Sequence, residues 1–289
     1  MELSKVGLWS PTFLWGGPDR RDVAAELDEL GYGALWIGAA SGDLELVEDI
    51  LDATPRLIVA TGIVNIWLSD AAELATAYHR VAGRFADRFI LGVGMGHAPA
   101  AEALGRRYER PLEMLTTYLD GLDAGGVPVD RRVLAALRPR ALELAASRAA
   151  GAHPYLVNPE HTAAAREVLG EGVLLAPEQK VIMAGDRADA HALARAHLEY
   201  YLTLPNYRRS FVALGFTDDD MVGGGSDRLV DAMYAWGGID AAAKRVAEHL
   251  DAGADHVAVQ VVGGTADVVT RTGTPQIDDW RRLAPVLLS

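Results

Sequence analysis

The chain has 289 residues, of which 50% are hydrophobic, so it can enclose one large core, and we expect a single domain over residues 1–289. Its formal charge of −13, together with the lack of any run of Lys or Arg that would form a basic stripe, argues against nucleic acid as a partner. There is no cysteine, which excludes disulfides, thiolate metal sites and a thiol nucleophile.

No stretch of the sequence is typical of a signal peptide or a membrane span. Residues 1–9 lack a charged region followed by an apolar stretch of signal-peptide length. No later apolar run approaches the roughly 18 residues that are needed to cross a bilayer. We therefore expect a soluble, cytoplasmic protein without a membrane partner.

Short stretches typical of β-strands alternate with helical patterns along most of the chain, which predicts a parallel sheet covered by helices. The expected strands are 5–9, 34–37, 57–66, 89–93, 133–137, 154–157, 180–183 and 256–262. The expected helices are 19–30, 43–52, 71–85, 100–123, 140–149 and 160–169, and residues 186–252 are almost wholly helical in composition. This order predicts an α/β fold, a (β/α)8 TIM barrel with inserted helices before the last strand, rather than an open Rossmann sheet.

Capping residues support several of these boundaries. Gly31 is expected to end the helix over 19–30, because glycine adopts the left-handed conformation of a carboxyl-terminal cap. Ser69 is expected to cap the helix over 71–85, and Ser226 a helix of the inserted region.

The active site of such a barrel lies at the carboxyl ends of the strands, so the segments that follow the strands hold the candidate residues. Residues 92–97 (GVGMGH) end one strand, and their glycines let the backbone approach a flat ring or a phosphate closely. They do not form the dinucleotide-binding pattern, because its third glycine would fall at His97, and the Lys and Ser/Thr of a P-loop are missing. A close-packed strand end explains the same glycines, so both interpretations stay open.

Two other segments are also candidates for ligand binding. Gly62 lies inside the strand expected over 57–66, where an isolated glycine indicates a bulge or a close backbone approach. Pro139 is expected to be the first residue of a helix, which leaves free N–H groups directed at the strand end. An anion could bind there with help from Arg138, although an arginine at such a point is also often solvated.

The histidines give weaker indications. His153 precedes the strand expected over 154–157, so a role in the site and a position at the opposite end of the barrel are equally open. The histidines show no metal-ligand spacing, and we expect no metal site. Residues 223–228 (GGGSDR) are either a mobile lid or a flexible connection between helices.

Read together, these segments resemble the luciferase-like monooxygenase superfamily. The matching stretches are LIVATGIVN at 57–65, GRF at 83–85, FILGVGMGH at 89–97, and LAAL at 134–137 with Pro139, in the same order and spacing. AGADHV at 252–257, with GFTDDD at 215–220 and GGSDR at 224–228, is similar to an actinobacterial subgroup of coenzyme F420-dependent oxidoreductases. The resemblance covers nearly the whole chain.

The resemblance implies a flavin or deazaflavin held at the carboxyl ends of the strands. Relatives often have a bulge with a non-prolyl cis peptide behind the central cofactor ring, and the matching bond here is Gly62–Ile63. The positions flanking the ring match Met95, Gly96 and His97. The positions along the cofactor's side chain and phosphate match 136–138. The candidate cofactor-binding set is therefore Gly62, Ile63, Asn65, Met95, Gly96, His97, Ala136, Leu137, Arg138 and His153.

Two features depart from the family pattern. Ala39 and Ala40 stand where sugar-phosphate dehydrogenases of the family have an Asp-His pair, so their acid–base assignment does not carry over. Arg138 stands where relatives commonly have glycine, and it could either hold a phosphate or crowd it.

The leading hypothesis is an oxidoreductase that transfers hydride between C5 of coenzyme F420 and a small organic substrate. His97 is the candidate proton donor or acceptor, since its ordinary pKa lies near working pH. Trp9 and Trp15 are candidates for the wall of an apolar substrate pocket. The alternatives are an FMN-dependent monooxygenase of the same fold and a catalytically inactive barrel that only binds a ligand. Homodimers are usual in the family.

Overall fold

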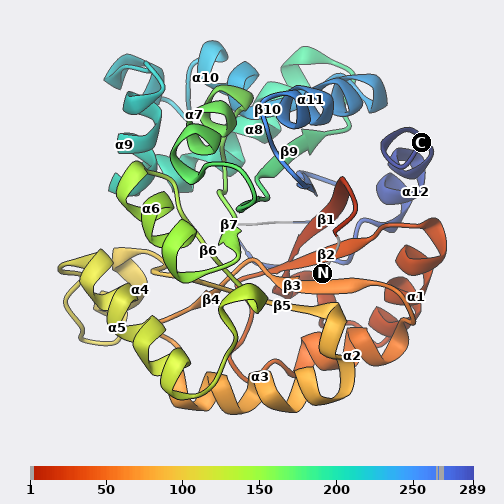
Figure 1. Cartoon of the computed structure of the whole chain (residues 1–289). Coiled ribbons are helices and arrows are strands. Elements are labelled where there is room, and N and C mark those ends of the chain that lie inside the picture. Colours follow the sequence, from red (N-terminus) through yellow and green to blue (C-terminus); the bar gives the residue numbers. More distant parts are fainter. Residues whose placement is uncertain (1–2, 265, 267–269) are drawn as a thin grey trace.

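The computed structural model describes residues 3–264, 266 and 270–289 (Figure 1). Its strands pair in parallel wherever a pairing is formed. They are β1 Val6–Pro11, β2 Ala34–Gly38, β3 Ile58–Thr61, β4 Val64–Asn65, β5 Phe89–Gly94, β6 Arg132–Leu134, β7 Gly151–Ala152, β8 Leu174–Leu175, β9 Glu178–Ile182, β10 Tyr234–Trp236 and β11 Val257–Val261.

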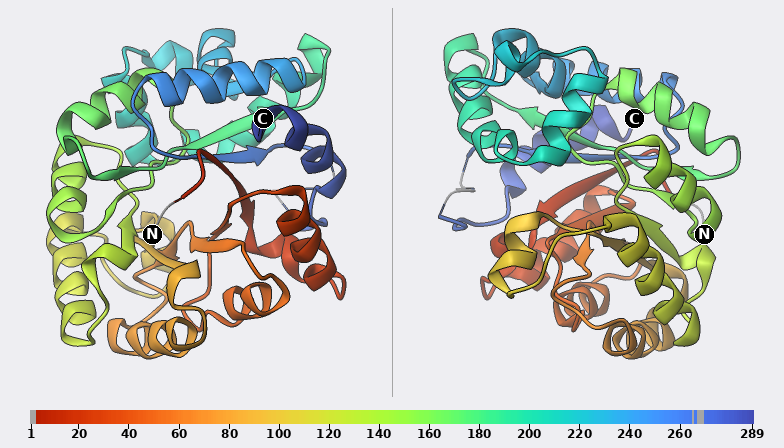
Figure 2. Two further views of the ribbon diagram at one scale, coloured as in Figure 1. Left: turned by 45° about the vertical axis from the view of Figure 1, so that its right-hand side comes forward. Right: turned by 90° about the vertical axis from the view of Figure 1, so that its left-hand side faces the viewer.

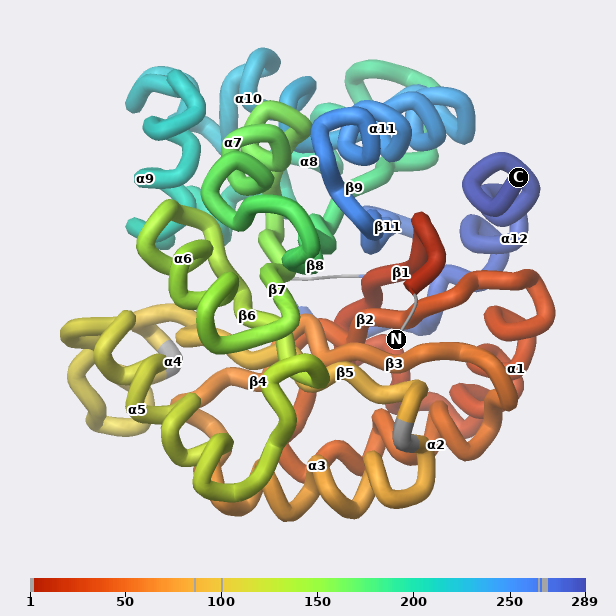
Figure 3. The backbone as a smooth tube through the Cα atoms, viewed as in Figure 1, coloured from red at the N-terminus to blue at the C-terminus, as the bar shows by residue number. Residues whose placement is uncertain are grey.

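The strands curl into a ring. Their order is β10-β9-β11-β1-β2-β3-β5-β6-β7-β8, with β4 paired to β5. β8 stands at one end of this order and β9 lies next to the other end. In the chain only residues 176 and 177 separate these two strands (Figure 3). Ala176 N–H donates to Ala152 O at 3.0 Å, and Ala258 N–H donates to Pro177 O at 2.9 Å. Residues 174–182 therefore connect β7 to β11, and the predicted TIM-barrel-like α/β fold is confirmed.

Helices surround the strands (Figure 2). The α-helices are α1 Arg20–Leu30, α2 Glu45–Ala53, α3 Ala71–Phe85, α4 Ala98–Ala103, α5 Pro111–Ala124, α6 Pro139–Arg148, α7 Pro159–Leu169, α8 Arg187–Leu202, α9 Pro205–Ala213, α10 Asp227–Met233, α11 Ile239–Asp251 and α12 Ile277–Leu287. Short 3-10 helices are η1 Thr12–Trp15, η2 Ala86–Arg88, η3 Val129–Arg131 and η4 Asp218–Met221. Within the described ranges, no helix combines the length and apolar character that crossing a membrane requires.

Most of the expected caps are present. Gly31 has a φ of 92° at the end of α1, and the Ser226 hydroxyl accepts a hydrogen bond from Leu229 N at the start of α10. The expected cap at Ser69 is wrong. Asp70 takes that place, because its Oδ1 accepts a hydrogen bond from Ala72 N at 2.8 Å.

Three expected elements differ from those in the structure. The helix expected over 100–123 is two helices, α4 and α5, because Gly105 adopts a φ of +68° and Pro111 starts a new helix. The strand expected over 154–157 is wrong, since β7 lies at 151–152. Pro154 has no N–H to donate, and Leu156 has a φ of 57°, outside the extended region. The strand expected over 57–66 is interrupted between β3 and β4 at the Gly62–Ile63 peptide, which is cis as predicted.

Strand boundaries elsewhere shift by a few residues. The strand expected over 133–137 is β6, which ends at Leu134, and the one expected over 180–183 is β9, which begins at Glu178. The short strands β8 and β10 were not expected. Stretches of two or three residues carry too little alternation to be recognised in a sequence.

The buried side chains form three hydrophobic groups. One fills the ring of strands and includes Trp9, Trp36, Ile90 and Val133. A second lies between the strands and the surrounding helices. A third belongs mainly to the inserted helices α8, α9 and α10.

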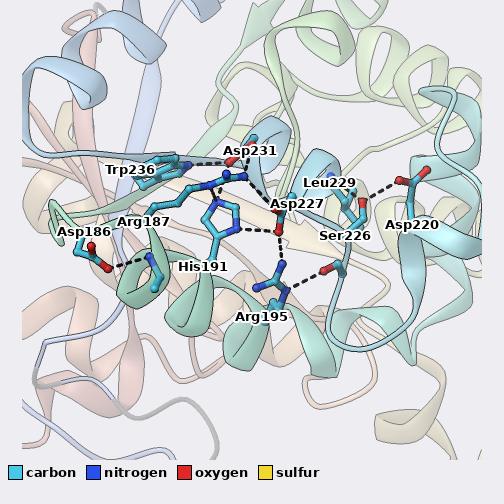
Figure 4. A network of polar contacts seen from close by, with 12 residues as sticks. Asp186, Arg187, His191, Arg195, Asp220, Ser226, Asp227, Leu229, Asp231 and Trp236 are labelled. Carbon is cyan, nitrogen blue, oxygen red and sulfur yellow. Dashed lines mark hydrogen bonds and ion pairs between the residues drawn. The ribbon is translucent and has the colours of Figure 1, made fainter.

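The inserted helices are also joined by a polar network (Figure 4). His191 of α8 lies between two carboxylates of α10, with Nδ1 3.1 Å from Asp227 and Nε2 2.8 Å from Asp231. Arg187 and Arg195 of α8 add ion pairs to Asp227. The predicted helical insertion before the last strand is therefore present, and these contacts join α8 to α10.

Candidate functional site

Three strand ends meet closely on one side of the barrel mouth. A Cβ atom on Gly94 would lie 2.8 Å from Ala135 Cβ and 3.1 Å from Ile63 Cγ1. A Cβ atom on Gly96 would collide with the side chain of Asn65. The predicted residues of β4 and of the segment after β5 are therefore brought together. Only glycine at 94 and 96 permits this approach.

His153 lies beside Gly62 inside the barrel. A Cβ on Gly62 would be 3.1 Å from His153 Nε2 and 2.7 Å from Trp9 Nε1. Because β7 ends at Ala152, His153 follows the carboxyl end of its strand. The sequence left open at which end of the barrel His153 lies. The structure places it in the interior beside Gly62.

The environment of His153 keeps its ring neutral. Its Nδ1 lies 2.6 Å from Ala176 O and donates to it, and its ring stacks on Trp36 at 4.2 Å. Burial lowers the pKa of His153 to about 3. Nε2 is enclosed without a hydrogen-bond partner among the described residues. With Nδ1 as the donor, Nε2 is an acceptor.

His97 is half-buried under aromatic rings of the inserted helices. Its ring centroid lies 5.6 Å from that of Tyr207 and 6.5 Å from that of Tyr200. Burial lowers the pKa of His97, so the imidazole is neutral near pH 7. His97 precedes α4, but its side chain does not cap that helix. A purely capping role for the imidazole is thus not seen.

The segment after β6 provides a less enclosed surface. Ala136 is buried, and Leu137 O lies 2.8 Å from His161 Nε2. Arg138 is exposed at the start of α6, which begins at Pro139 as predicted and has no side-chain cap. Among the ion pairs of the described residues, none involves Arg138. Pro139 has no N–H, and the N–H groups of Ala141 and Leu142 donate to Arg138 O at 2.9 and 3.0 Å, contrary to the expected set of free N–H groups. An anion at this helix end would therefore meet the Arg138 guanidinium and the N–H of Arg140.

The two candidate wall tryptophans lie in different surroundings. Trp9 packs against Tyr155 with ring centroids 5.0 Å apart. Trp15 stacks on Trp280 of α12 at 6.1 Å and donates to Ser10 Oγ, in the hydrophobic group between strands and helices. Only Trp9 of this pair belongs to the mouth.

A polar group on the opposite side of the mouth was missed by sequence reasoning. Lys180 Nζ lies 2.8 Å from Glu178 Oε2 and 3.6 Å from the centre of the Tyr155 ring. Both charged side chains have no exposed surface. Burial lowers the pKa of Lys180 to about 8 and raises the pKa of Glu178. Opposite charges two residues apart in a strand point to the same face, and this spacing was the available signal.

Inserted helices complete this polar side. Tyr201 of α8 has its hydroxyl 2.9 Å from that of Tyr155, and Tyr207 of α9 lies 5.1 Å from the Tyr201 ring. A separate cavity of about 660 Å³ lies outside these rings, between segments 66–71 and 106–118. None of the predicted site residues lines that cavity.

Comparison with known proteins finds a family model that matches part of the chain. Residues 17–125 match the luciferase-like monooxygenase family model. This luciferase-like match spans Gly62, Ile63 and Asn65, together with 95–97, and ends before 136–138 and His153. The resemblance to the superfamily is therefore confirmed. No curated protein matches the chain.

Solved structures share the fold over nearly the whole chain. An F420-dependent secondary alcohol dehydrogenase, in complex with an F420-acetone adduct, has a TM-score of 0.73 at 12% identity, with 99% of each chain covered. The coenzyme F420-dependent tetrahydromethanopterin reductase from Methanopyrus kandleri has a TM-score of 0.70 at 14% identity, covering 100% of this chain and 99% of that one.

A solved structure in complex with FMN is similar to about the same degree. The oxygenating constituent of 3,6-diketocamphane monooxygenase from Pseudomonas putida, in complex with FMN, has a TM-score of 0.67 at 17% identity, covering 99% of this chain and 96% of that one. At these identities the likeness shows the fold alone.

The close approach at Gly96 can be tested by substitution in this luciferase-like region. Gly96→Ala is expected to destabilise the protein more than Gly105→Ala, because both glycines have a positive φ but only Gly96 faces a side chain. The left-handed backbone costs about 1–2 kcal/mol in either variant, and overpacking against Asn65 adds about 1–3 kcal/mol for Gly96→Ala. Urea unfolding of both variants measures the difference. Equal losses would contradict the contact.

Proposed function

We propose that the protein is an oxidoreductase that holds coenzyme F420, a deazaflavin, against the strand ends at 62–65, 94–97 and 135–138. The close approach of these three strand ends carries the proposal, because glycine at 94 and 96 lets the strand ends pack against Ile63, Asn65 and Ala135 and so gather into one support for a flat ring. A further observation fits the group: Arg138 at the start of α6 is exposed and forms no ion pair with the residues that the structure describes.

When bound, the deazaflavin would supply the site that accepts or donates hydride at C5. The protein's contribution is then positioning and electrostatics. Gly94 and Gly96 would let the backbone support the ring, and Arg138 with the N–H of Arg140 would hold the phosphate. His97, neutral near pH 7, accepts the proton when the substrate is oxidised. The substrate in this proposal is a small organic molecule.

Parallel titrations test the choice of cofactor. Deazaflavin is expected to bind the purified protein at least about tenfold more tightly than FMN, a difference of ~1.4 kcal/mol. The expectation rests on the similarity of segments 215–228 and 252–257 to deazaflavin users. Fluorescence titration with each cofactor gives the two dissociation constants.

Each other outcome points to a different function. Equal or reversed affinities would contradict the deazaflavin proposal and favour an FMN-dependent monooxygenase. If deazaflavin binds but its reduced form reacts with no substrate of a broad panel, the barrel that only binds a ligand would be favoured instead.

A further inference from the structure

Gln260 is a buried amide in the polar group of the barrel interior. It lies on β11 in register with Lys180 of β9, and only 4% of its surface is exposed. His256, Ala258 and Gln260 alternate along the strand, so they share the inner face. The amide oxygen lies 3.3 Å from Lys180 Nζ.

The neighbours of Gln260 determine which way its amide faces. A lysine ammonium can only donate hydrogen bonds, so the amide atom next to Lys180 must be the oxygen. The hydroxyl of Tyr155 donates to the same oxygen at 3.0 Å. Both acceptor positions of Oε1 are thus used, and Lys180 is itself held by Glu178 at 2.8 Å. The NH2 group therefore lies in the same plane on the other side of the Cγ–Cδ bond, pointing away from Lys180 and Tyr155.

The NH2 group of Gln260 has no partner in the part of the chain that the structure describes. Nε2 donates no hydrogen bond to any of these residues. Trp9 Nε1 and His153 Nε2 also have no partner, but they are fully enclosed, whereas Gln260 Nε2 is not. It is a donor at the open end of an otherwise satisfied network. Leaving such a donor unpaired when a ligand excludes water would cost about 1–3 kcal/mol, so a ligand there must offer an acceptor.

The side chains near this donor indicate which kind of ligand it would bind. Trp9 and Tyr155 pack together with ring centroids 5.0 Å apart, and Tyr207 lies 6.4 Å from Tyr155. These rings form an apolar wall, which the Tyr155 hydroxyl connects to Gln260. Trp9 of this wall also lies beside Gly62, where a Cβ would be 2.7 Å from its Nε1, so the wall adjoins the glycine-rich strand ends. If the cofactor ring occupies those ends, as in the proposed function on which this inference rests, the wall faces the substrate.

We propose that Gln260 is a substrate-binding residue that donates a hydrogen bond from Nε2 to the carbonyl oxygen of a compact apolar ketone. Lys180 and Tyr155 act as positioning residues, because they hold the amide oxygen and so aim the NH2 group at the substrate. The buried Lys180 ammonium also places positive charge next to the amide oxygen of Gln260, which makes the NH2 group a stronger donor.

Titration of the deazaflavin-loaded protein with cyclopentanone tests this assignment by ¹H–¹⁵N NMR. The side-chain amide signals of Gln260 are expected to shift, while those of Gln179 stay in place. Gln179 is the matched control because it is buried on the neighbouring strand with its amide bonded to Lys180 O and Met233 O. Gln260→Glu removes the donor but keeps an oxygen toward Lys180, and it is expected to weaken ketone binding about tenfold.

The positioning role of Lys180 is read from the same signals. Lys180→Met frees the amide oxygen, so the ketone-induced shift of Gln260 is expected to shrink even when the protein remains folded. If Lys180→Met fails to fold, the Gln260→Glu titration still decides the assignment, with the indole N–H of Trp9 as reporter.

Failure of the inference is distinct from failure of the proposed function. Deazaflavin binding without a response of Gln260 to the ketone would overturn the inference alone. Unchanged ketone affinity in Gln260→Glu would overturn it as well. A response of Gln260 in a protein that does not bind deazaflavin would support the residue assignment and contradict the proposed cofactor.

Discussion

Replacing Lys180 by methionine is expected to lower the free energy of unfolding by about 3–5 kcal/mol, because it leaves a buried carboxylate without its partner. Lys180 and Glu178 are both fully buried and lie 2.8 Å apart. Glu178 retains only the hydrogen bond from Leu156 N at 3.0 Å after the substitution. Chemical denaturation of the variant and the wild type gives the difference.

Two controls separate the loss of pairing from the loss of a lysine. The double variant Glu178→Gln/Lys180→Met removes both charges and is expected to recover most of the lost stability. Lys244→Met removes a lysine from an exposed pair with Glu248 at 3.9 Å, and should change stability by less than about 0.5 kcal/mol. A double variant as unstable as the single one would show that the cost is due to packing.

His97→Ala is expected to lower turnover about a hundredfold or more, because under the proposed function His97 moves a proton in the transition state. Stability should change little, since the imidazole does not cap α4 and its Nδ1 has no partner among the described residues. Turnover and melting temperature are measured on the same variant. His79→Ala is the matched control, because His79 is an exposed histidine that bonds Gly125 O at the surface, away from the predicted site residues.

The pH dependence gives an independent measurement of the same role. Burial lowers the pKa of His97, so the proton-accepting form is present throughout the neutral range. Substrate oxidation should therefore be constant near pH 7 and fall as the pH drops below that lowered pKa. His97→Ala should remove this acidic limb. Wild-type turnover in the variant would exclude His97 from the mechanism.

The barrel and its glycine-rich rim were predictable because they depend on local patterns. Alternation of strands and helices indicates the ring, and Gly62, Gly94 and Gly96 mark backbone approaches that only glycine allows. The position of His153 was not predictable. The apolar run from Pro154 to Val157 looks like a strand, but the missing N–H of Pro154 and the positive φ of Leu156 end the extended chain earlier.

The residues of the polar side of the mouth were harder to predict from the sequence, because they come together only in the tertiary structure. Glu178 and Lys180 could have been recognised as an inward pair once the strand was drawn to begin at residue 178 instead of 180. Tyr201 and Tyr207 could not, because nothing in an inserted helical region indicates which of its side chains turn toward the barrel. Gln260 was placed correctly on the last strand, but its importance appears only when its oxygen is seen to face Lys180.

The separation of the inserted helices from the barrel core has a consequence for engineering. Tyr207 packs in the hydrophobic group of α8, α9 and α10, whereas Trp9 packs inside the ring of strands. His191 with Asp227 and Asp231 joins α8 to α10, whereas Trp236 of β10 donates to Asp231 and Tyr234 of β10 bonds His197 of α8. Libraries that vary the mouth-facing positions of α8 and α9 can therefore reshape ligand preference if they keep these bonds to β10. Grafting the longer segment 186–236 from a relative would exchange one wall of the mouth together with these bonds.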